Sequence, residues 1–149
     1  MNTEEIETYM LNDPCILSLY GGVLAKDQLP VNVKSPSMFV VNLDTSDKAG
    51  IHWIVIFVKS KHTCEYFDPL GDPPDQFLTS YMMSQSNKVV VSSKQCQATN
   101  TASCGKFCLY FCFFRSRNNT MKEILQSFTN VLLYNEAKVY YFYKFTSRV

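Results

Sequence analysis

Apolar residues occur along the chain in short runs whose composition predicts strands. The clearest run is 51–58, which is almost continuously β-branched or aromatic, as in a buried strand. A shorter run of the same type occupies 38–43. The polar segment 59–63 predicts a hairpin turn, and 64–68 is the strand expected to return from it. Two further strand-like runs follow at 88–92 and 139–145.

Other segments have the pattern of helices. Thr3 and the acidic residues after it predict an N-cap and a first helical turn, and this helix is expected to end near Asn12. Two more helices are predicted at 75–84 and 120–133. Segment 13–37 contains the glycine pair Gly21-Gly22 and, further on, Pro30 and Pro36, so we expect it to be irregular.

The most apolar helical pattern lies at 102–114. This segment contains no proline and is apolar on nearly all sides, which predicts a helix buried in the middle of the fold. Together these elements predict an α+β fold, in which a small, mostly antiparallel sheet packs on a central buried helix.

Length and composition favour one soluble domain. The 149 residues are enough for a single substantial core, so residues 1–149 are expected to form one domain. Apolar residues make up 46% and charged residues 18% of the chain, and no apolar run approaches the roughly 18 residues of a membrane span. The first residues are acidic, whereas a secretory signal begins with basic ones. We therefore expect an intracellular protein that does not bind membranes.

The overall charge is nearly neutral, with 14 basic and 13 acidic side chains. A general surface for binding polyanions is therefore not supported. The six cysteines are expected to be reduced thiols, because no secretory signal points to a disulfide framework. Cys104, Cys108 and Cys112 recur every four residues along one helical stripe. Zinc binding lacks a second pair of ligands, so Cys108 and Cys112 are interpreted as small core residues.

Cys104 and His52 are candidates for a nucleophile and its base. Cys104 falls at the first turn of the predicted central helix, where the helix dipole stabilises a thiolate. His52 lies early in the clearest strand, whereas His62 lies in the polar turn and is expected to be solvated. Taken alone, a buried cysteine or a histidine in a strand is usually structural. Gly105 lacks a side chain where a substrate backbone would need to approach.

Asp68 and Gln97 supply the other parts that a cysteine hydrolase needs. Asp68 ends the strand that pairs with the strand of His52, so its carboxylate is placed to orient the imidazole. Gln97 precedes Cys104 by seven residues, and its amide is a candidate donor to an oxyanion, with Gln95 as the nearby competitor. An Asp-Pro pair alone is more often a turn, and a lone glutamine more often a surface residue. All four roles in one order predict cysteine-dependent acyl transfer.

Three segments carry a resemblance to a known family: Gly50-Ile51-His52-Trp53, Tyr66-Phe67-Asp68-Pro69-Leu70-Gly71, and Gln97 through Ala102-Ser103-Cys104-Gly105-Lys106-Phe107-Cys108. They resemble the adenain-like maturation proteases of adenoviruses, which share a clan with the SUMO- and NEDD8-specific proteases. The resemblance implies a nucleophile at Cys104, a base at His52, an orienting acid at Asp68 and an oxyanion-hole amide at Gln97. Trp53 beside the base would shield it, and Trp53 and Gly105 are expected to contact substrate.

The same resemblance implies the biology of the protein. Its substrates would be viral precursor proteins, cleaved at Gly-Gly or Gly-X sequences during virion maturation. The protease would act as a monomer, in the host nucleus and in the virion, and would need no metal. The source would be a DNA virus or a virus-like mobile element.

The chain departs from the family at the acid, and in two further respects that concern activation: a missing cysteine, and a shorter chain with nearly neutral charge. Asp68 stands where the adenain family has Glu, which is a mild change because Asp is usual elsewhere in the clan. The family uses a cysteine between its acid and its glutamine to bind an activating peptide through a disulfide, and the corresponding stretch 84–88 contains none. Neither a disulfide-linked peptide nor, given the near-neutral charge, a DNA cofactor is therefore supported as the activator.

Two other functions remain open from the sequence. An isopeptidase acting on ubiquitin-like or SUMO-like modifiers would share the chemistry but recognise a folded modifier. A capsid-associated interaction module would keep the fold without the activity.

Overall fold

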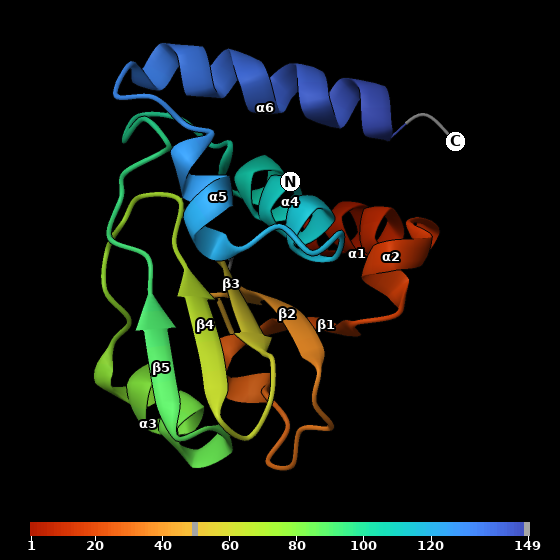
Figure 1. The fold of residues 1–149 in the computed structure, drawn as a ribbon, viewed down its shortest axis with the longest axis vertical. Helices are drawn as coiled ribbons and strands as arrows, with labels where there is room; N and C mark the ends of the chain where they lie inside the picture. The colour runs from red at the N-terminus through yellow and green to blue at the C-terminus, as the bar shows by residue number, and fades with distance from the viewer. Residues whose placement is uncertain (49–50, 148–149) are drawn as a thin grey trace.

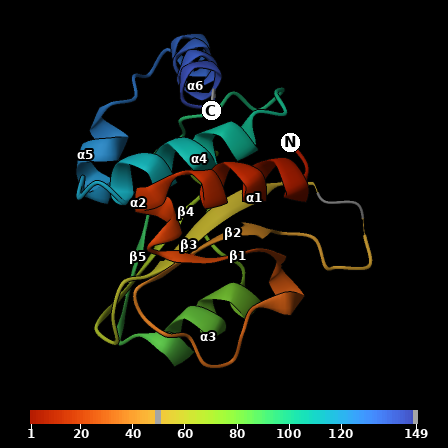
Figure 2. The same cartoon turned by 90° about the vertical axis from the view of Figure 1, so that its right-hand side faces the viewer.

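The computed structural model describes residues 1–48 and 51–147 and shows a central sheet with helices on both faces (Figure 1). Helices α1, α2, α4 and α5 cover one face, and α3 covers the other (Figure 2). Helix α6 lies beyond α4, as the outermost layer on that side. The bounds are α1 Thr3–Asn12, α2 Pro14–Leu17, β1 Tyr20–Ala25, the 3-10 turn η1 Lys26–Gln28, β2 Ser37–Asn42, β3 Trp53–Val58, β4 Thr63–Phe67, α3 Gln76–Gln85, β5 Lys88–Val91, α4 Cys104–Arg115, α5 Met121–Gln126 and α6 Leu132–Thr146.

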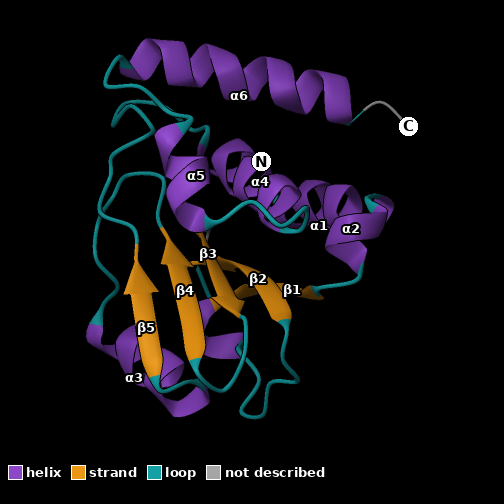
Figure 3. Cartoon of the chain, in the orientation of Figure 1, coloured by secondary structure: helices purple, strands orange, loops and turns teal. Residues whose placement is uncertain are grey.

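The sheet has five strands in the order β1-β2-β3-β4-β5 (Figure 3). The two central pairings, β2 with β3 and β3 with β4, are antiparallel. Both edge pairings, β1 with β2 and β4 with β5, are parallel. The expected α+β class is confirmed, and the antiparallel pairing we expected describes the centre of a mixed sheet. The edges are parallel because the chain crosses over through η1 before β2 and through α3 before β5.

Strand β3 is buried along its whole length, as its sequence predicts. Its side chains alternate between two hydrophobic clusters, because successive residues of a strand point to opposite faces. Val55 and Phe57 pack in the cluster that contains α4, whereas Ile54 and Ile56 pack in the cluster that contains α3. Strand β3, which begins directly after His52, is therefore held by packing on both of its faces.

Helix α4 is the predicted central helix, and it begins at Cys104 itself. Phe107 and Phe111 are fully buried, and burying each such ring contributes about 2 kcal/mol. Phe111 stacks on Phe67 of β4 with ring centroids 4.7 Å apart. At the other end of the helix, Arg115 forms a bidentate salt bridge with Glu65 of β4, with N···O distances of 2.9 and 3.0 Å. These contacts fix α4, and with it Cys104, against the sheet.

The N-terminal region differs from the prediction in two places. The N-cap of α1 is Asn2 and not Thr3, and Asn2 forms a capping box with Glu5. Residues 20–25, which we expected to be irregular, form β1. The sequence did not indicate this strand because a glycine pair is unusual within a strand. Gly21 is needed there for close packing against β2. A Cβ at Gly21 would lie 2.6 Å from the ring of Phe39 on β2.

The C-terminal region corrects two further predictions. The helix expected at 120–133 is capped by Thr120 but ends at Gln126. The strand expected at 139–145 is wrong, because these residues belong to the helix α6. The inward-facing residues of α6 follow helical spacing and are buried or half-buried: Asn135, Val139 and Phe142. The ring of Phe142 packs edge-on against that of Tyr110 in α4, with ring centroids 5.1 Å apart. Packing on α4 thus overrides the strand preference of an aromatic run.

No helix within the described residues is both long and apolar enough to cross a membrane.

Candidate active site

His52 and Asp68 meet at one end of the β3–β4 hairpin. His52 comes directly before β3 and Asp68 directly after β4, and the pairing of Val55 with Phe67 sets the register between them. His52 Nε2 lies 2.7 Å from Asp68 Oδ1. The antiparallel hairpin therefore places the predicted acid against the predicted base.

A glycine turn holds the carboxylate of Asp68 in place. The side chain is buried, and Oδ1 also accepts a hydrogen bond from the backbone N–H of Leu70 at 2.8 Å. Gly71 closes the turn by donating its N–H to the carbonyl of Asp68 at 2.8 Å. Gly71 has a φ of 77°, and a Cβ there would lie 2.8 Å from the backbone carbon of Lys94. Glycine is therefore needed both for the turn and for its close approach to the next loop.

The imidazole of His52 is held in its charged form. Burial alone would lower its pKa, but hydrogen bonds and charges from Asp68 and Cys104 outweigh burial and raise the pKa to about 9. Since Nε2 is bonded to Asp68, the nitrogen left to face Cys104 is Nδ1. His52 is thus an imidazolium at neutral pH, with one proton directed toward the sulfur.

Cys104 is the partner of this imidazolium. Burial acts to raise the pKa of the thiol, but the hydrogen bond with His52 and the backbone N–H of Trp53 act against it. The charge of His52 and the backbone N–H of Gly105 also stabilise the thiolate, so the pKa lies below its ordinary value. The two side chains together form a thiolate–imidazolium pair, the arrangement of an activated cysteine nucleophile.

Gln97 lies in the loop between β5 and α4, against the Asp68 turn. The carbonyl of Pro69 accepts the backbone N–H groups of Cys96 and Gln97, at 2.8 and 2.9 Å. The Gln97 side chain is buried, and its Nε2 donates to the carbonyl and to the hydroxyl of Thr101, at 3.1 and 3.3 Å. Its Oε1 has no hydrogen-bond partner among the described residues. Gln97 therefore reaches the site as part of a fixed loop.

The competitor Gln95 does not reach the site. It is exposed, and its side chain donates to the carbonyl of Gln97 at 3.1 Å. His62 is likewise exposed in the β3–β4 turn, as expected. Sequence reasoning therefore chose the glutamine and the histidine that the structure brings together with Cys104.

A cleft of about 280 Å³ contains these groups. It is lined by Met1, Ile51, His52, Trp53, Leu70, Gln97, Thr99, Thr101, Ala102 and Cys104. Trp53 forms one wall, and its indole N–H donates to the carbonyl of Met1 at 3.1 Å. Leu70 and Met1 were not expected in the site. Leu70 was within the motif that contains Asp68, whereas nothing in the sequence pointed to Met1.

Gly105 lies beside the nucleophile but faces α1. A Cβ there would lie 3.1 Å from Cβ of Met1 and 3.4 Å from Cδ1 of Ile6. The structure thus gives this glycine a packing role, and its expected contact with substrate stays a prediction. Gly50, which begins the first motif, lies outside the described residues.

A family model described as adenovirus endoprotease matches residues 25–147, which is most of the chain. The chain belongs to the adenovirus endoprotease family. The proteases of Bovine adenovirus 7 and Bovine adenovirus 4 are 33% and 28% identical to it, over 58% and 59% of its length. It covers 51% and 53% of those two proteins, so the chain spans about half the length of the curated relatives that it matches.

A solved structure shows the same fold. The central domain of an uncharacterized protein from Legionella pneumophila superposes on this adenovirus endoprotease family member with a TM-score of 0.58. The match covers 100% of this chain and 98% of the other at 12% sequence identity. At this identity the likeness concerns the fold alone.

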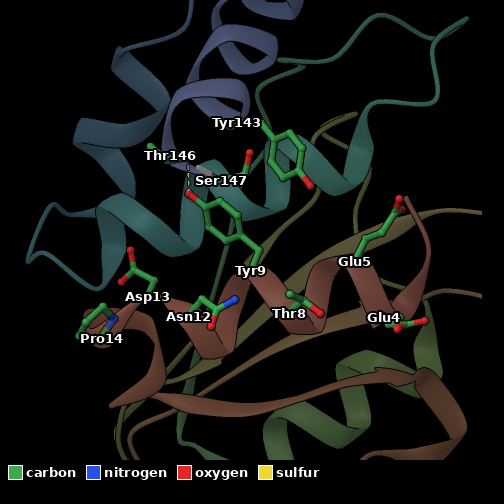
Figure 4. A pocket seen from close by; sticks show the side chains of 10 residues that line it. All are labelled: Glu4, Glu5, Thr8, Tyr9, Asn12, Asp13, Pro14, Tyr143, Thr146 and Ser147. Atoms are coloured by element: carbon green, nitrogen blue, oxygen red, sulfur yellow. Dashed lines mark hydrogen bonds between the residues drawn. The ribbon is translucent and has the colours of Figure 1, made fainter. Parts of the chain in front are cut away.

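Another groove of this family member, about 310 Å³ in volume, lies between α1 and the end of α6 (Figure 4). Tyr9 donates a hydrogen bond to Thr146 across it, and Glu4 and Glu5 lie along its rim. Its lining contains no cysteine or histidine, so we do not assign it catalytic chemistry. Within residues 1–48 and 51–147, no three His, Cys, Asp or Glu side chains lie close enough together to hold a metal.

Proposed function

We propose that this protein is a viral cysteine endopeptidase that cleaves precursor structural proteins during virion maturation. The observation that supports it most is the buried Cys104–His52–Asp68 network, which opens onto a cleft and holds a thiolate beside an imidazolium. Membership in the adenovirus endoprotease family supports the same activity and viral proteins as the substrates. It also supports action within host cells and virions, and we extend this to the host nucleus.

The chemistry that these groups support is acyl transfer in two halves. The Cys104 thiolate attacks the scissile carbonyl carbon, and the carbonyl electrons move to oxygen as an oxyanion. When this intermediate collapses, the C–N bond breaks and His52 gives its proton to the leaving amine. His52, now neutral, then takes a proton from water as the water attacks the thioester. Collapse of the second intermediate releases the acid and restores the thiolate–imidazolium pair.

Gln97 is the proposed donor to the oxyanion. Both acceptors of its Nε2 belong to Thr101, so one N–H directed between them leaves the second N–H for the substrate. The backbone N–H of Cys104 would be the other donor, since the first N–H groups of a helix have no partner within the helix. Such a side-chain donor is typically worth about 3 kcal/mol in the transition state.

Cleavage at Gly-Gly or Gly-X sequences is the proposed specificity. It rests on the family resemblance. We propose that the protein acts as a monomer without a metal. A peptide activator bound without a disulfide, or a DNA cofactor, is a matter for experiment.

The test is cleavage of fluorogenic peptides by the wild type and by Cys104→Ala. We expect hydrolysis of Gly-Gly and Gly-X peptides, none of peptides with leucine in place of the glycines, and no turnover by the variant. A parallel assay uses a ubiquitin-like domain fused through Gly-Gly to a reporter. Cleavage that requires the folded domain would replace our proposal with the isopeptidase. If no substrate is cleaved, with or without extract of infected cells, the fold serves as an interaction module instead.

A further inference from the structure

Two consecutive side chains of α6 reach the loop that carries Gln97. Asn135 is fully buried, and its Nδ2 donates to the carbonyl of Cys96 at 3.0 Å and to that of Thr129 at 2.8 Å. Its Oδ1 accepts the backbone N–H of Thr129 at 2.9 Å. The start of α6 is therefore fixed to the residue directly before Gln97. None of these contacts belongs to the catalytic network described above.

Glu136, the next residue, ends a chain of hydrogen bonds that begins at Gln97. Both carboxylate oxygens of Glu136 lie 2.8 Å from the hydroxyl of Ser103, which donates to them. The Ser103 hydroxyl lies 3.0 Å from the hydroxyl of Thr101, which in turn accepts from Gln97 Nε2 at 3.3 Å. The side chains of Glu136, Ser103 and Thr101 thus connect α6 to the proposed oxyanion donor.

The charge at the end of this chain fixes which partner donates at Ser103. A carboxylate only accepts hydrogen bonds, so Ser103 commits its single hydroxyl proton to Glu136. Ser103 can then only accept from Thr101, whose hydroxyl also lies 3.0 Å from the carbonyl of Ala98, a second acceptor for its proton. The carbonyl of Thr101 can only accept, so its bond from Gln97 Nε2 at 3.1 Å sets which way the amide faces. Ser103 is the N-cap residue of α4, yet its side chain makes no capping bond to the helix. Its hydroxyl is used for the chain instead.

We propose that Glu136 is a positioning residue, which holds Ser103 and Thr101, and with them the two acceptors of the Gln97 amide, in place. The inference rests on the proposed function for its catalytic meaning, because an oriented amide matters only where an oxyanion forms. Reversing the amide would turn an acceptor toward the oxyanion in place of a donor. The unpartnered Oε1 of Gln97 shows that the present orientation does not come from a bond to its oxygen.

The test compares Glu136→Gln, which keeps the shape but removes the charge, with Ser103→Ala, which breaks the chain. We expect each to lower kcat about tenfold with KM within about twofold, as for a small misplacement of a catalytic group. The combined variant should lose no more than Ser103→Ala alone, since both act through one chain. Alkylation of Cys104 by iodoacetamide forms no oxyanion, so its rate and pH dependence should stay at the wild-type level.

A second readout does not depend on catalysis. The side-chain NH2 signals of Gln97 in the ¹⁵N–¹H spectrum, assigned with Gln97→Glu, should shift in Glu136→Gln. Lys144→Gln is the matched control, because it removes one charge from an exposed position of α6 away from the loop. It should leave kcat and the Gln97 signals unchanged.

Each outcome decides the proposal. Wild-type kcat together with unshifted Gln97 signals in Glu136→Gln would overturn it. A parallel fall in Cys104 alkylation and in Tm would also overturn it, because Glu136 would then be a general structural residue. If the wild type cleaves nothing, the proposed function fails, and the Gln97 signals alone decide whether Glu136 orients the amide.

Discussion

Cys104 and Cys108 lie one turn apart on the same helix, and both are buried, yet their thiols have opposite chemistry. The pKa of Cys104 lies below the ordinary thiol value, whereas burial raises the pKa of Cys108 well above it. The negative charges of Cys104 and Asp68 near Cys108 also disfavour a second thiolate. Burial in an apolar helix therefore leaves a cysteine as an unreactive, protonated thiol unless neighbouring groups stabilise its thiolate.

The groups that stabilise the Cys104 thiolate come mostly from other elements of the fold. His52 arrives from the start of β3, and backbone N–H groups of Trp53 and Gly105 point to the sulfur. The position at the first turn of α4 also favours a thiolate. One helical turn further on, the sulfur of Cys108 lies in the core cluster without such donors. Reactivity is thus a property of the junction between α4 and β3, and not of the helix.

Removing each sulfur in turn gives the largest expected contrast. Cys104→Ala should abolish peptide cleavage, because it removes the thiol that pairs with His52, with a loss of at least about 10⁴-fold. Cys108→Ala should retain cleavage and lower the free energy of unfolding by about 1 kcal/mol through the small cavity it leaves. Peptide kinetics and denaturant unfolding of both variants provide the check. Cleavage by Cys104→Ala would show that the nucleophile has been misassigned.

Removing the imidazole should make Cys104 resemble Cys108. In His52→Ala the thiolate loses its main stabilising partner, and no group remains to protonate the leaving amine. We expect cleavage to fall by about 10³-fold or more, measured as kcat/KM. A variant that keeps even a tenth of the wild-type activity would contradict the assignment of His52 as the base.

Truncating Gln97, the proposed oxyanion donor, should reduce turnover but leave the difference in reactivity between Cys104 and Cys108 unchanged. Gln97→Ala should lower kcat by about 10²-fold, near 3 kcal/mol, because the amide acts only in the transition state. Cys104 should remain as reactive toward iodoacetamide as in the wild type. Gln95→Ala is the matched control and should cleave normally, since Gln95 is exposed. Equal effects of the two changes would remove the special role of Gln97.

The pH dependence should follow the two members of the pair. Because the pKa of Cys104 is lowered, the thiolate persists to a lower pH than that of an ordinary cysteine, and activity is lost as the pH falls through that lowered pKa. Because the pKa of His52 is raised to about 9, the imidazolium and its catalytic proton are lost as the pH rises through about 9. A profile of kcat/KM should therefore fall about fivefold between pH 9 and 10. Rising activity across that interval would contradict the ion pair.

The smallest expected effect comes from the turn that connects the acid to the Gln97 loop. Gly71→Ala forces a side chain into a positive φ and against the backbone of Lys94, which should cost about 1–2 kcal/mol of stability. The displaced loop should lower kcat a few-fold while the thiol of Cys104 stays activated. Thermal unfolding and peptide kinetics measure both effects. Unchanged stability would mean that the turn adapts freely.

The sequence predicted the parts of the molecule whose local pattern agrees with their environment. Strand β3 and helix α4 are buried on all sides, so composition alone indicates them. Segment 139–145 misled us because its aromatic residues favour a strand locally, whereas their packing on α4 makes them helical. Strand β1 was missed because Gly21 serves a contact with Phe39 that only the folded sheet reveals.

The four candidate catalytic residues could be selected from the sequence because they stand in short motifs in a recognisable order, and the structure brings them together. The bonds that hold these residues together could not be predicted in this way. The carbonyl of Pro69 fixes the Gln97 loop, and Glu136 reaches Ser103 from a helix 33 residues away. The spacing of these residues along the sequence does not predict their contacts, because the contacts form only when distant elements pack together.

The most direct test of this account is the reactivity of Cys104 relative to Cys108 at mildly acidic pH. The protein is treated with iodoacetamide, and mass spectrometry follows the labelling of each cysteine in the wild type and in His52→Ala. We predict fast labelling of Cys104 alone in the wild type, and loss of that preference in the variant. Equal, slow labelling of Cys104 and Cys108 in the wild type would contradict the thiolate–imidazolium pair on which the proposed function rests.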